Sequence, residues 1–481
     1  MNNWVTEELK TADLGDKRLN KRLSVIVEGL ASKPDKTIPQ TFENPSQAQA
    51  AYEFWSNPHV KASQIIAAHR DATLLRIKNH SIVLVIQDTT DLEFASLATR
   101  RGLGEISKQG AEGIKVHNVL AVTSEGIPLG LIKQKAWVRK KMRKGKTYEE
   151  RKRKIEEKES YRWLESLKET QELVPAQTEV VTICDREGDI FELFAFPRRE
   201  KSHLLIRAAQ DRTVKSSKQP EEVQKLFSHL KSQQVKGEMV LDLQRTPRRK
   251  PRKAKIQVKY TTLQLTVPNN NPHLKYLEPV EVGAILAEEI NPPPKEQKVS
   301  WLLLTTLPIN NVSDAFNYLK WYSMRWLIER YHYVLKSGCK IEELQLETGE
   351  RLLRALACYS IVAWRLLWLT YTSRLDPHQP ATVALEEEEW QSLYCTINKK
   401  LELPQEIPTI YQCVRWIARL GGFLGRKGDG EPGVMTLWRG WQRLMDYAAM
   451  WKLMVAVLKE LDSDKDKDME RVKGNCNKIC D

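Results

Sequence analysis

The spacing of apolar and polar positions divides the chain into a helical first part, a mixed α/β centre and a helical last part. Between residue 1 and about residue 62, apolar side chains recur every three or four positions, as at Leu19, Leu23, Ile26 and Leu30. Basic side chains gather near the start of the same segment. The pattern predicts a small basic helical unit, which could be a DNA-reading surface or an ordinary solvated helix face.

Short continuous apolar runs, typical of strands buried on both faces, occur from about residue 63 to residue 210. The predicted elements are strands at 81–87, 179–184 and 203–209, a hairpin turning at Ser124-Glu125-Gly126, and a charged helical stretch at about 147–172. Strands that alternate with helical stretches are typical of an α/β domain.

A change of composition at about 211–305 predicts an insertion into that domain. Several strand-like runs follow a cluster of Pro and basic residues at 245–255, so we expect a β-rich segment with a basic loop that lines DNA. One long helix should follow at 313–336, with Ser313 as its N-cap.

Helical spacing returns in the last part of the chain, at about 350–373 and 434–460. The charged tail from about residue 461 is expected to be loose. We therefore expect three domains, which are a helical domain at 1–62, an α/β domain at 63–373 with the insertion, and a helical region at 374–481.

The charge of the chain favours a polyanionic partner. Lys and Arg outnumber Asp and Glu by 76 to 62, which gives a net charge of +14. A basic chain of this size most often meets nucleic acid. The first residues lack the apolar core of a signal peptide, and we find no run of about 18 apolar residues, so no membrane partner is expected.

The seven cysteines are odd in number and widely scattered, which favours a reducing cytoplasm over a disulfide framework. Cys476 and Cys480 have no second Cys or His pair nearby, so a zinc site is not expected there. The protein is therefore expected to be cytoplasmic.

Two aspartates, Asp88 and Asp185, each directly follow a predicted buried strand. If those strands are neighbours, both carboxylates emerge at the same sheet edge, where they could hold the divalent ions that phosphodiester chemistry uses. An aspartate after a strand is also common in turns, so either residue alone is a weak signal. Glu187 and Asp189 are rival ligands, which we interpret as solvated or helix-capping residues.

Four polar residues of the predicted helix at 313–336 share one face. At about 100° per residue, Tyr322, Arg325, Glu329 and Lys336 fall within about 60° of one another. Such a face could offer a carboxylate to a metal ion and cations to phosphates. The alternative is an exposed helix with an ordinary Arg325–Glu329 ion pair.

The spacing of these four residues resembles the signature of the DDE transposases of bacterial insertion sequences, in the insertion-sequence-four group that includes the Tn5 transposase. The resemblance covers nearly the whole chain. Similar segments follow in the same order, including LGDKRLNKRL, QDTT, KVHNVL, EKESYRW, CDREGDI, LAEEINPPP, WLLLTT and IARLGGFLGRK.

The resemblance implies an RNase-H-like catalytic core with a β-strand insertion, flanked by an N-terminal helical DNA-binding domain and a C-terminal helical dimerisation domain. The DDE acids map onto Asp88, Asp185 and Glu329, which would bind two Mg²⁺ ions, with Mn²⁺ as an alternative. Such an enzyme is a cut-and-paste transposase of the bacterial cytoplasm. It binds the inverted-repeat ends of a transposon as a homodimer in a synaptic complex, cleaves them by nicking and by forming and resolving a hairpin, and joins the 3′ ends to target DNA.

The resemblance also implies DNA contacts. Tyr322, Arg325 and Lys336 match residues that hold phosphates and a flipped base near the cut, and Trp301 matches a tryptophan on which that base stacks. The family's remaining DNA contacts map onto Arg207, Arg18 and Arg22.

The chain departs from the Tn5 pattern in three places, one of which is the stretch 374–408, which matches poorly. Leu19 stands where Tn5 transposase has a second arginine beside the one matched by Arg18, so the DNA-end sequence is expected to differ. The segment 138–154 is far more basic than its counterpart in the family. It could be an extra DNA contact or a solvated helix.

An apolar stripe near the end of the chain could be core or could face a partner subunit. Its members are Leu437, Trp438, Trp441, Leu444, Met445, Ala448, Trp451 and Val455. Two other functions stay open, which are another RNase-H-like nuclease and a catalytically silent, element-derived DNA-binding protein or inhibitor. An intact set of three acids speaks against the silent protein.

Overall fold

The computed structural model describes residues 3–42, 44–94, 101–106, 110–139, 153–216, 219–243, 251–269, 271–294 and 296–476. The helices are α1 (Asn3–Glu8), α2 (Lys17–Ser32), α3 (Ile38–Thr41), α4 (Pro45–Ser56), α5 (Ala62–Ile77), α7 (Tyr161–Leu173), α8 (Phe191–Ala195), α9 (Leu226–Ser232), α10 (Val312–Ser323), α11 (Trp326–Tyr333), α12 (Gly349–Leu375), α13 (Glu387–Asn398), α14 (Ile410–Leu420) and α15 (Val434–Cys476). The strands are β1 (Ile82–Glu93), β2 (Gly104–Glu105), β3 (Glu112–Thr123), β4 (Pro128–Trp137), β5 (Glu179–Cys184), β6 (Ser202–Arg207), β7 (Thr213–Ser216), β8 (Gln219–Lys225), β9 (Gly237–Leu243), β10 (Arg252–Leu265), β11 (Val280–Glu289) and β12 (Ser300–Thr305).

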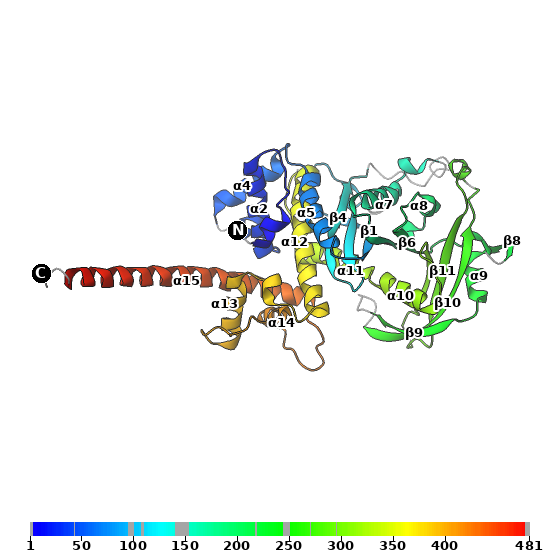
Figure 1. Ribbon diagram of the computed structural model, residues 1–481. Helices are drawn as coiled ribbons and strands as arrows, with labels where there is room; N and C mark the ends of the chain where they lie inside the picture. Colours follow the sequence, from blue (N-terminus) through cyan, green and yellow to red (C-terminus); the bar gives the residue numbers. More distant parts are fainter. Residues whose placement is uncertain are drawn as a thin grey trace.

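Short helices form the N-terminal unit, as the sequence predicted. Leu23, Ile26 and Leu30 of α2 are buried in its core, whereas Leu19 is only partly buried. α2 begins after Asp16, whose side chain accepts a hydrogen bond from the backbone N–H of Arg18 at 2.7 Å and so caps the helix. The unit lies beside α5 and α12, away from the strands of the insertion (Figure 1).

A buried ionic cluster fastens α1 to α5. The Glu8 carboxylate, 4% exposed, lies 2.5 Å from Nδ1 of His69 and 2.8 Å from Nη1 of Arg76. Nε2 of His69 accepts a hydrogen bond from the backbone N–H of Leu131 on β4 at 2.9 Å. His69 therefore donates from Nδ1 to Glu8, and the cluster ties the N-terminal unit to the sheet.

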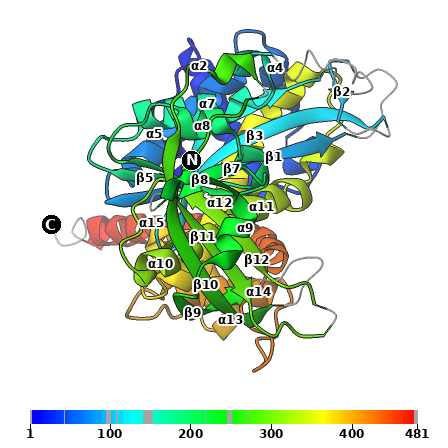
Figure 2. The same ribbon diagram turned by 90° about the vertical axis from the view of Figure 1, so that its right-hand side faces the viewer.

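The strands form one mixed sheet in the order β2-β3-β1-β5-β6-β12-β11-β10-β7-β8, with β4 beside β3 and β9 beside β10. β1, β5 and β6 are parallel neighbours, and β3 and β12 pair with them in the antiparallel sense. The insertion is thus part of the central sheet, because β12 pairs with β6. Figure 2 shows β10 and β11 side by side on this outer part of the sheet.

Two of the predicted strands and the hairpin are confirmed. The strand at 179–184 is β5, and the strand predicted at 203–209 is β6, which ends at Arg207. β3 and β4 form the hairpin, and its turn uses Gly126 with φ of +110°, a conformation that favours glycine.

Strand β1 is longer than its apolar run predicted. The run ends at Gln87, but β1 continues to Glu93, so Asp88 lies within the strand and not just after it. Beyond Gln87, β1 still pairs with β3, from Asp88 opposite Asn118 onward, whereas its pairing with β5 has stopped. A strand with one open side tolerates polar side chains, which is why the apolar run stops before the strand does.

The prediction of a single helix at 313–336 is wrong. The segment forms α10, a break at 324–325, α11 and a π-helical turn at Val334–Gly338. The backbone N–H groups at the break bond three residues back, which tightens the helix there. The N-cap is Asn311, whose side chain accepts from the backbone N–H of Ser313 at 2.8 Å.

The charged helix expected from about residue 147 is α7, which begins only at Tyr161. Residues 153–160 contain a 3₁₀ turn at Ile155–Glu157 and no α-helix, and Glu159 accepts a hydrogen bond from the indole N–H of Trp137 at 3.4 Å. Most of the basic segment 138–154, and the first part of the basic loop at 245–255, lie outside the described residues.

The last part of the chain holds more helix than predicted. α13 and α14 were not expected, and α15 continues to Cys476, so the tail from residue 461 is helical up to that residue rather than loose. Charged residues of both signs are compatible with an exposed helix. α15 extends away from the rest of the chain (Figure 1).

Helix α12 is the central core helix. By length and composition it could cross a membrane, but 83% of its most apolar window is buried inside the protein. It contacts α2, α4, α5, β4, α14 and α15. Its apolar composition is therefore explained by packing within the chain.

Candidate active site

Asp88 and Asp185 stand at the same level of two neighbouring parallel strands. β1 and β5 are in register up to Ile86 opposite Ile183, and each aspartate follows two residues later. Because side chains alternate along a strand, the aspartates continue the face of Ile86 and Ile183, which packs against α11 and α12. The structure thus brings the two carboxylates together on the face that α11 covers.

Helix α11 adds a third acid and a cation. Arg325, at its start, forms an ion pair with Glu329, and its Nη1 lies 3.9 Å from Oδ2 of Asp88. The Glu329 side chain is half exposed, while those of Arg325 and Asp88 are mostly buried. Asp88, Asp185, Glu329 and Arg325 therefore form one cluster with more negative than positive charge.

The electrostatics of Asp88 report the same crowding. Its pKa is raised to about 7, first by burial and then by the charges of Asp185 and Glu329, against the lowering effect of Arg325. A cation placed among these acids would favour their ionised forms.

The donor set suits a hard divalent cation. Carboxylate oxygens are the ligands that Mg²⁺ and Mn²⁺ prefer. Within the part of the chain that the structure describes, no three His, Cys, Asp or Glu side chains already converge on one ion position. Glu329 is instead paired with Arg325. The two aspartates fit a divalent ion, and Glu329 could join them once Arg325 has another partner.

A buried histidine that the sequence analysis missed faces Asp88 from α11. Nδ1 of His332 lies 3.9 Å from Oδ2 of Asp88, and its Nε2 accepts a hydrogen bond from Asn118 at 3.0 Å. The Asn118 side-chain oxygen is engaged by Gln134 at 2.9 Å, which fixes the amide orientation. Burial lowers the pKa of His332 to about 3, so the ring is neutral and carries its proton on Nδ1, toward Asp88.

An aromatic and basic cluster lies beside Asp185. The rings of Trp301 and Tyr322 meet edge to face with centroids 5.2 Å apart. Arg207 interacts electrostatically with the Tyr322 hydroxyl and donates to the carbonyl of Ser300 at 3.1 Å. Trp301 is half-buried, but Tyr322 is only 3% exposed. The break puts Tyr322 and Arg325 on different helices, yet their side chains still interact electrostatically, and Tyr322 is buried rather than at an exposed surface.

Lys336 lies farther along β1 than Asp88. Its Nζ donates to the carbonyl oxygen of Asp91 and lies 3.5 Å from the carboxylate of Glu342. The side chain is 30% exposed, so its ammonium group is open to an anion of the solvent or of DNA.

The two rival acids have other partners. Asp189 is fully buried, pairs with Arg212 at 2.6 Å and accepts hydrogen bonds from the backbone N–H groups of Ala209 and Gln210. Its expected solvated or capping role is wrong, because it closes the loop after β6. Glu187 is exposed, as expected, but forms an ion pair with Arg162 at 2.7 Å.

Arg162 is a second residue that the sequence analysis missed. It lies on α7 and contacts Thr89 and Glu187, each close to one of the two aspartates. It lies in the family-like segment EKESYRW, but its spacing does not single it out, so only the three-dimensional structure reveals its contacts.

Two family models match the ends of the chain. Residues 1–60 match the family described as Transposase DNA-binding, and residues 361–452 match the Transposase Tn5 dimerisation domain.

The chain is a Tn5-like transposase. The matches give it a DNA-binding domain at one end and a dimerisation domain at the other, so DNA and a second copy of the chain are its partners.

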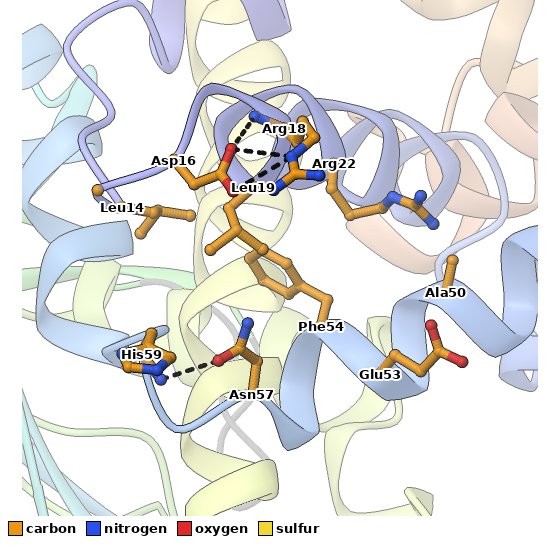
Figure 3. A pocket seen from close by; sticks show the side chains of 11 residues that line it. Leu14, Asp16, Arg18, Leu19, Arg22, Ala50, Glu53, Phe54, Asn57 and His59 are labelled. Carbon is orange, nitrogen blue, oxygen red and sulfur yellow. Dashed lines mark hydrogen bonds and ion pairs between the residues drawn. The ribbon is translucent and has the colours of Figure 1, made fainter.

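The DNA-binding domain of this Tn5-like transposase has a groove between α2 and α4 (Figure 3). Arg18 and Arg22 lie on its α2 side, and Leu19, Phe54 and His59 are among its other lining residues. Arg18 is 92% exposed and pairs with Asp16 at 3.0 Å. Both arginines are open to solvent, as a contact to phosphate requires.

In the dimerisation domain, the apolar stripe predicted on α15 is mostly core. Leu437, Trp438, Trp441, Leu444 and Ala448 are buried, Met445 packs partly against them, and Trp451 and Val455 are partly exposed.

A different row of α15 is left uncovered within the chain. Tyr447, Met450, Met454 and Val457 recur every three or four positions and are 38–66% exposed. An uncovered apolar row at this spacing is typical of a helix that pairs with another helix. The row begins within the matched dimerisation domain, which ends at residue 452, and continues beyond it.

Proposed function

We propose that this Tn5-like transposase cuts the inverted-repeat ends of a transposon and joins them to target DNA, with Asp88, Asp185 and Glu329 as the acids that bind two divalent ions, Mg²⁺ or Mn²⁺. The pairing of Asp88 and Asp185 at one level of β1 and β5, facing α11, carries the proposal. Bound there, the ions would supply an activated oxygen nucleophile and stabilise the leaving oxygen.

The central strand order supports an RNase-H-like core. In the order β4-β3-β1-β5-β6, only β3 runs antiparallel to the other four strands. The insertion enters after β6 and returns to it through β12. The three proposed acids then come from a central strand, from the end of its parallel neighbour and from the helix that covers them.

The chain's own cations suit a phosphate near these acids. Arg325 forms ion pairs with Glu329 and Asp88, so a DNA phosphate could take it over and free Glu329. Lys336 and Arg207 flank the site at its two ends. We propose that all three hold the DNA backbone around the scissile phosphate.

We propose that Trp301 takes the flipped base during hairpin formation. Tyr322 packs edge-on against the indole ring of Trp301, and Arg207 lies beside Tyr322. The indole is therefore held in place while part of it stays exposed. A held aromatic face stabilises an unstacked base by about 1–3 kcal/mol.

A cleavage assay tests the proposal. Purified full-length protein is incubated with DNA that carries the transposon end, with Mg²⁺ or Mn²⁺, and nicks, hairpins and blunt ends are separated on denaturing gels. Asp185→Asn and Glu329→Gln should abolish all products and leave DNA binding intact. Glu343→Gln, a change at an acid that is 69% exposed, serves as the control and should cleave normally.

A catalytically silent DNA-binding protein is the second candidate. It is favoured by the observation that the described acids do not already converge on one ion. It predicts tight DNA binding and dimerisation with no cleavage in either metal, and that result would replace the first proposal.

A further inference from the structure

Arg162 lies behind the two aspartates, on the opposite face of the sheet. Residues at odd positions of β1, such as Val83 and Val85, pack toward the end of α7, whereas Asp88 faces α11. The Arg162 side chain is 10% exposed, and its guanidinium lies 5.7 and 5.3 Å from the ring centroids of Trp137 and Trp163. Both rings are within cation–π distance of the group and restrict its orientation.

The guanidinium binds β1 directly after Asp88 and is linked through His117 to the residue before it. Nε of Arg162 donates to Oγ1 of Thr89 at 2.9 Å. Since arginine only donates, the Thr89 hydroxyl is free to give its proton to Nδ1 of His117, 2.9 Å away. Burial lowers the pKa of His117 well below its usual range, so the neutral ring donates from Nε2 to Gln87 at 3.2 Å. The residues before and after Asp88 are thus joined by one directional chain.

The same guanidinium holds the loop that follows β5. Nη2 of Arg162 donates to the Glu187 carboxylate at 2.7 Å, and the backbone N–H of Glu187 donates to Oδ1 of Asp185 at 2.8 Å. Nη1 donates to the carbonyl of Glu159 at 2.9 Å, which anchors the group to the start of α7. One planar fork therefore connects the segments of both aspartates.

We propose that Arg162 is a positioning residue that sets the separation of the Asp88 and Asp185 carboxylates, and with it the metal affinity of the site. This inference rests on the proposed function. Lysine cannot replace Arg162, because a single ammonium group lacks the planar fork that reaches Thr89 and Glu187 in fixed directions.

Metal binding tests the inference directly. Full-length Arg162→Lys and wild-type protein, each bound to uncut transposon-end DNA, are titrated with Mn²⁺, and free Mn²⁺ is measured by electron paramagnetic resonance. The loss of a group that orients metal ligands costs about 10–100-fold in metal affinity, so Arg162→Lys should weaken Mn²⁺ binding by that factor. The Mg²⁺ concentration for half-maximal cleavage should rise equally, while metal-free DNA binding stays unchanged.

Arg354 supplies a matched control. Its side chain is 8% exposed, and its guanidinium also donates to three partners, which are the carbonyls of Val60 and Trp55 and the Glu350 carboxylate. Arg354→Lys should lower the melting temperature but leave Mn²⁺ affinity unchanged. Thr89→Val, which cuts the chain to His117 without removing Arg162, should weaken Mn²⁺ binding in the same direction as Arg162→Lys and serves if that variant does not fold.

The possible outcomes separate the two ideas. Wild-type Mn²⁺ affinity in both Arg162→Lys and Thr89→Val would overturn the positioning role, as would an equal loss in Arg354→Lys. If the wild-type protein on DNA binds no Mn²⁺, or if Asp185→Asn binds Mn²⁺ as tightly as wild type does, the proposed metal site itself is refuted.

Discussion

Replacing Glu8 by glutamine tests whether the buried ionic cluster holds the DNA-binding domain against the central sheet. Burial alone would raise the pKa of Glu8, but His69 and Arg76 outweigh it and lower the pKa from 4.5 to about 2. At about 1.4 kcal/mol for each pH unit between the two values, the ionised carboxyl contributes about 3 kcal/mol to folding. Because the folded pKa is the lower one, this contribution is complete above about pH 4.5 and is lost as the pH falls toward 2.

Native-state hydrogen exchange measures the contribution of Glu8 to the local stability of the N-terminal helices. At pH 7, Glu8→Gln should lower the opening free energy of α1 and α2 by about 3 kcal/mol, which is roughly a hundredfold loss of protection. Urea unfolding of wild type and variant at pH 7 and pH 3 supplies the pH dependence, and the difference should shrink at pH 3. Glu7→Gln, at a neighbouring acid that is 63% exposed, is the control and should change neither quantity. An equal loss at both pH values would refute the electrostatic argument.

Three further substitutions have defined outcomes. Gly440→Ala would place its Cβ 1.7 Å from the Ile417 carbonyl oxygen where α15 crosses α14, so thermal unfolding should show a loss of about 1–3 kcal/mol or more, and a wild-type melting temperature would contradict the observed packing. Asp189→Asn leaves Arg212 buried without its charge partner and should cost about 3–5 kcal/mol in urea unfolding, whereas a neutral result would mean that the pair is dispensable. Burial raises the pKa of Glu389 from 4.5 to about 7, so its favourable protonated state is lost as the pH rises through 7. Glu389→Gln should therefore be more stable than wild type by up to about 3 kcal/mol at pH 8 and equally stable at pH 4. Equal stability at both pH values would show that Glu389 ionises freely in the folded protein.

The apolar patterns identified the elements that lie inside the core, and they failed where a partner element decides the outcome. The strand at 179–184 could be predicted because it is buried on both faces. The polar half of β1 could not, since only its pairing with β3 makes it a strand. The helix that carries Glu329 was expected in the right place, but the break before Arg325 leaves no mark in the 3.6-residue spacing.

The candidate site divides in the same way. Asp88, Asp185 and Glu329 could be proposed from their positions and from the family resemblance, and the structure places them in one cluster. Arg162 and His332 act only through contacts between residues that are far apart in the chain, such as those with Thr89 and Asn118. No spacing along the sequence encodes such contacts.

The pairing of β12 with β6 makes the insertion an unsuitable module for exchange. Deleting or swapping the insertion together with β12 would strip β6 of its neighbour and leave a row of unpaired backbone N–H and C=O groups at the edge of the central sheet. Such an edge invites aggregation. Trp301 and Arg207 would be displaced at the same time, because they sit on these two strands. Chimaeras of this protein should therefore be joined in the connections around α12, and grafts of the insertion alone should yield insoluble protein.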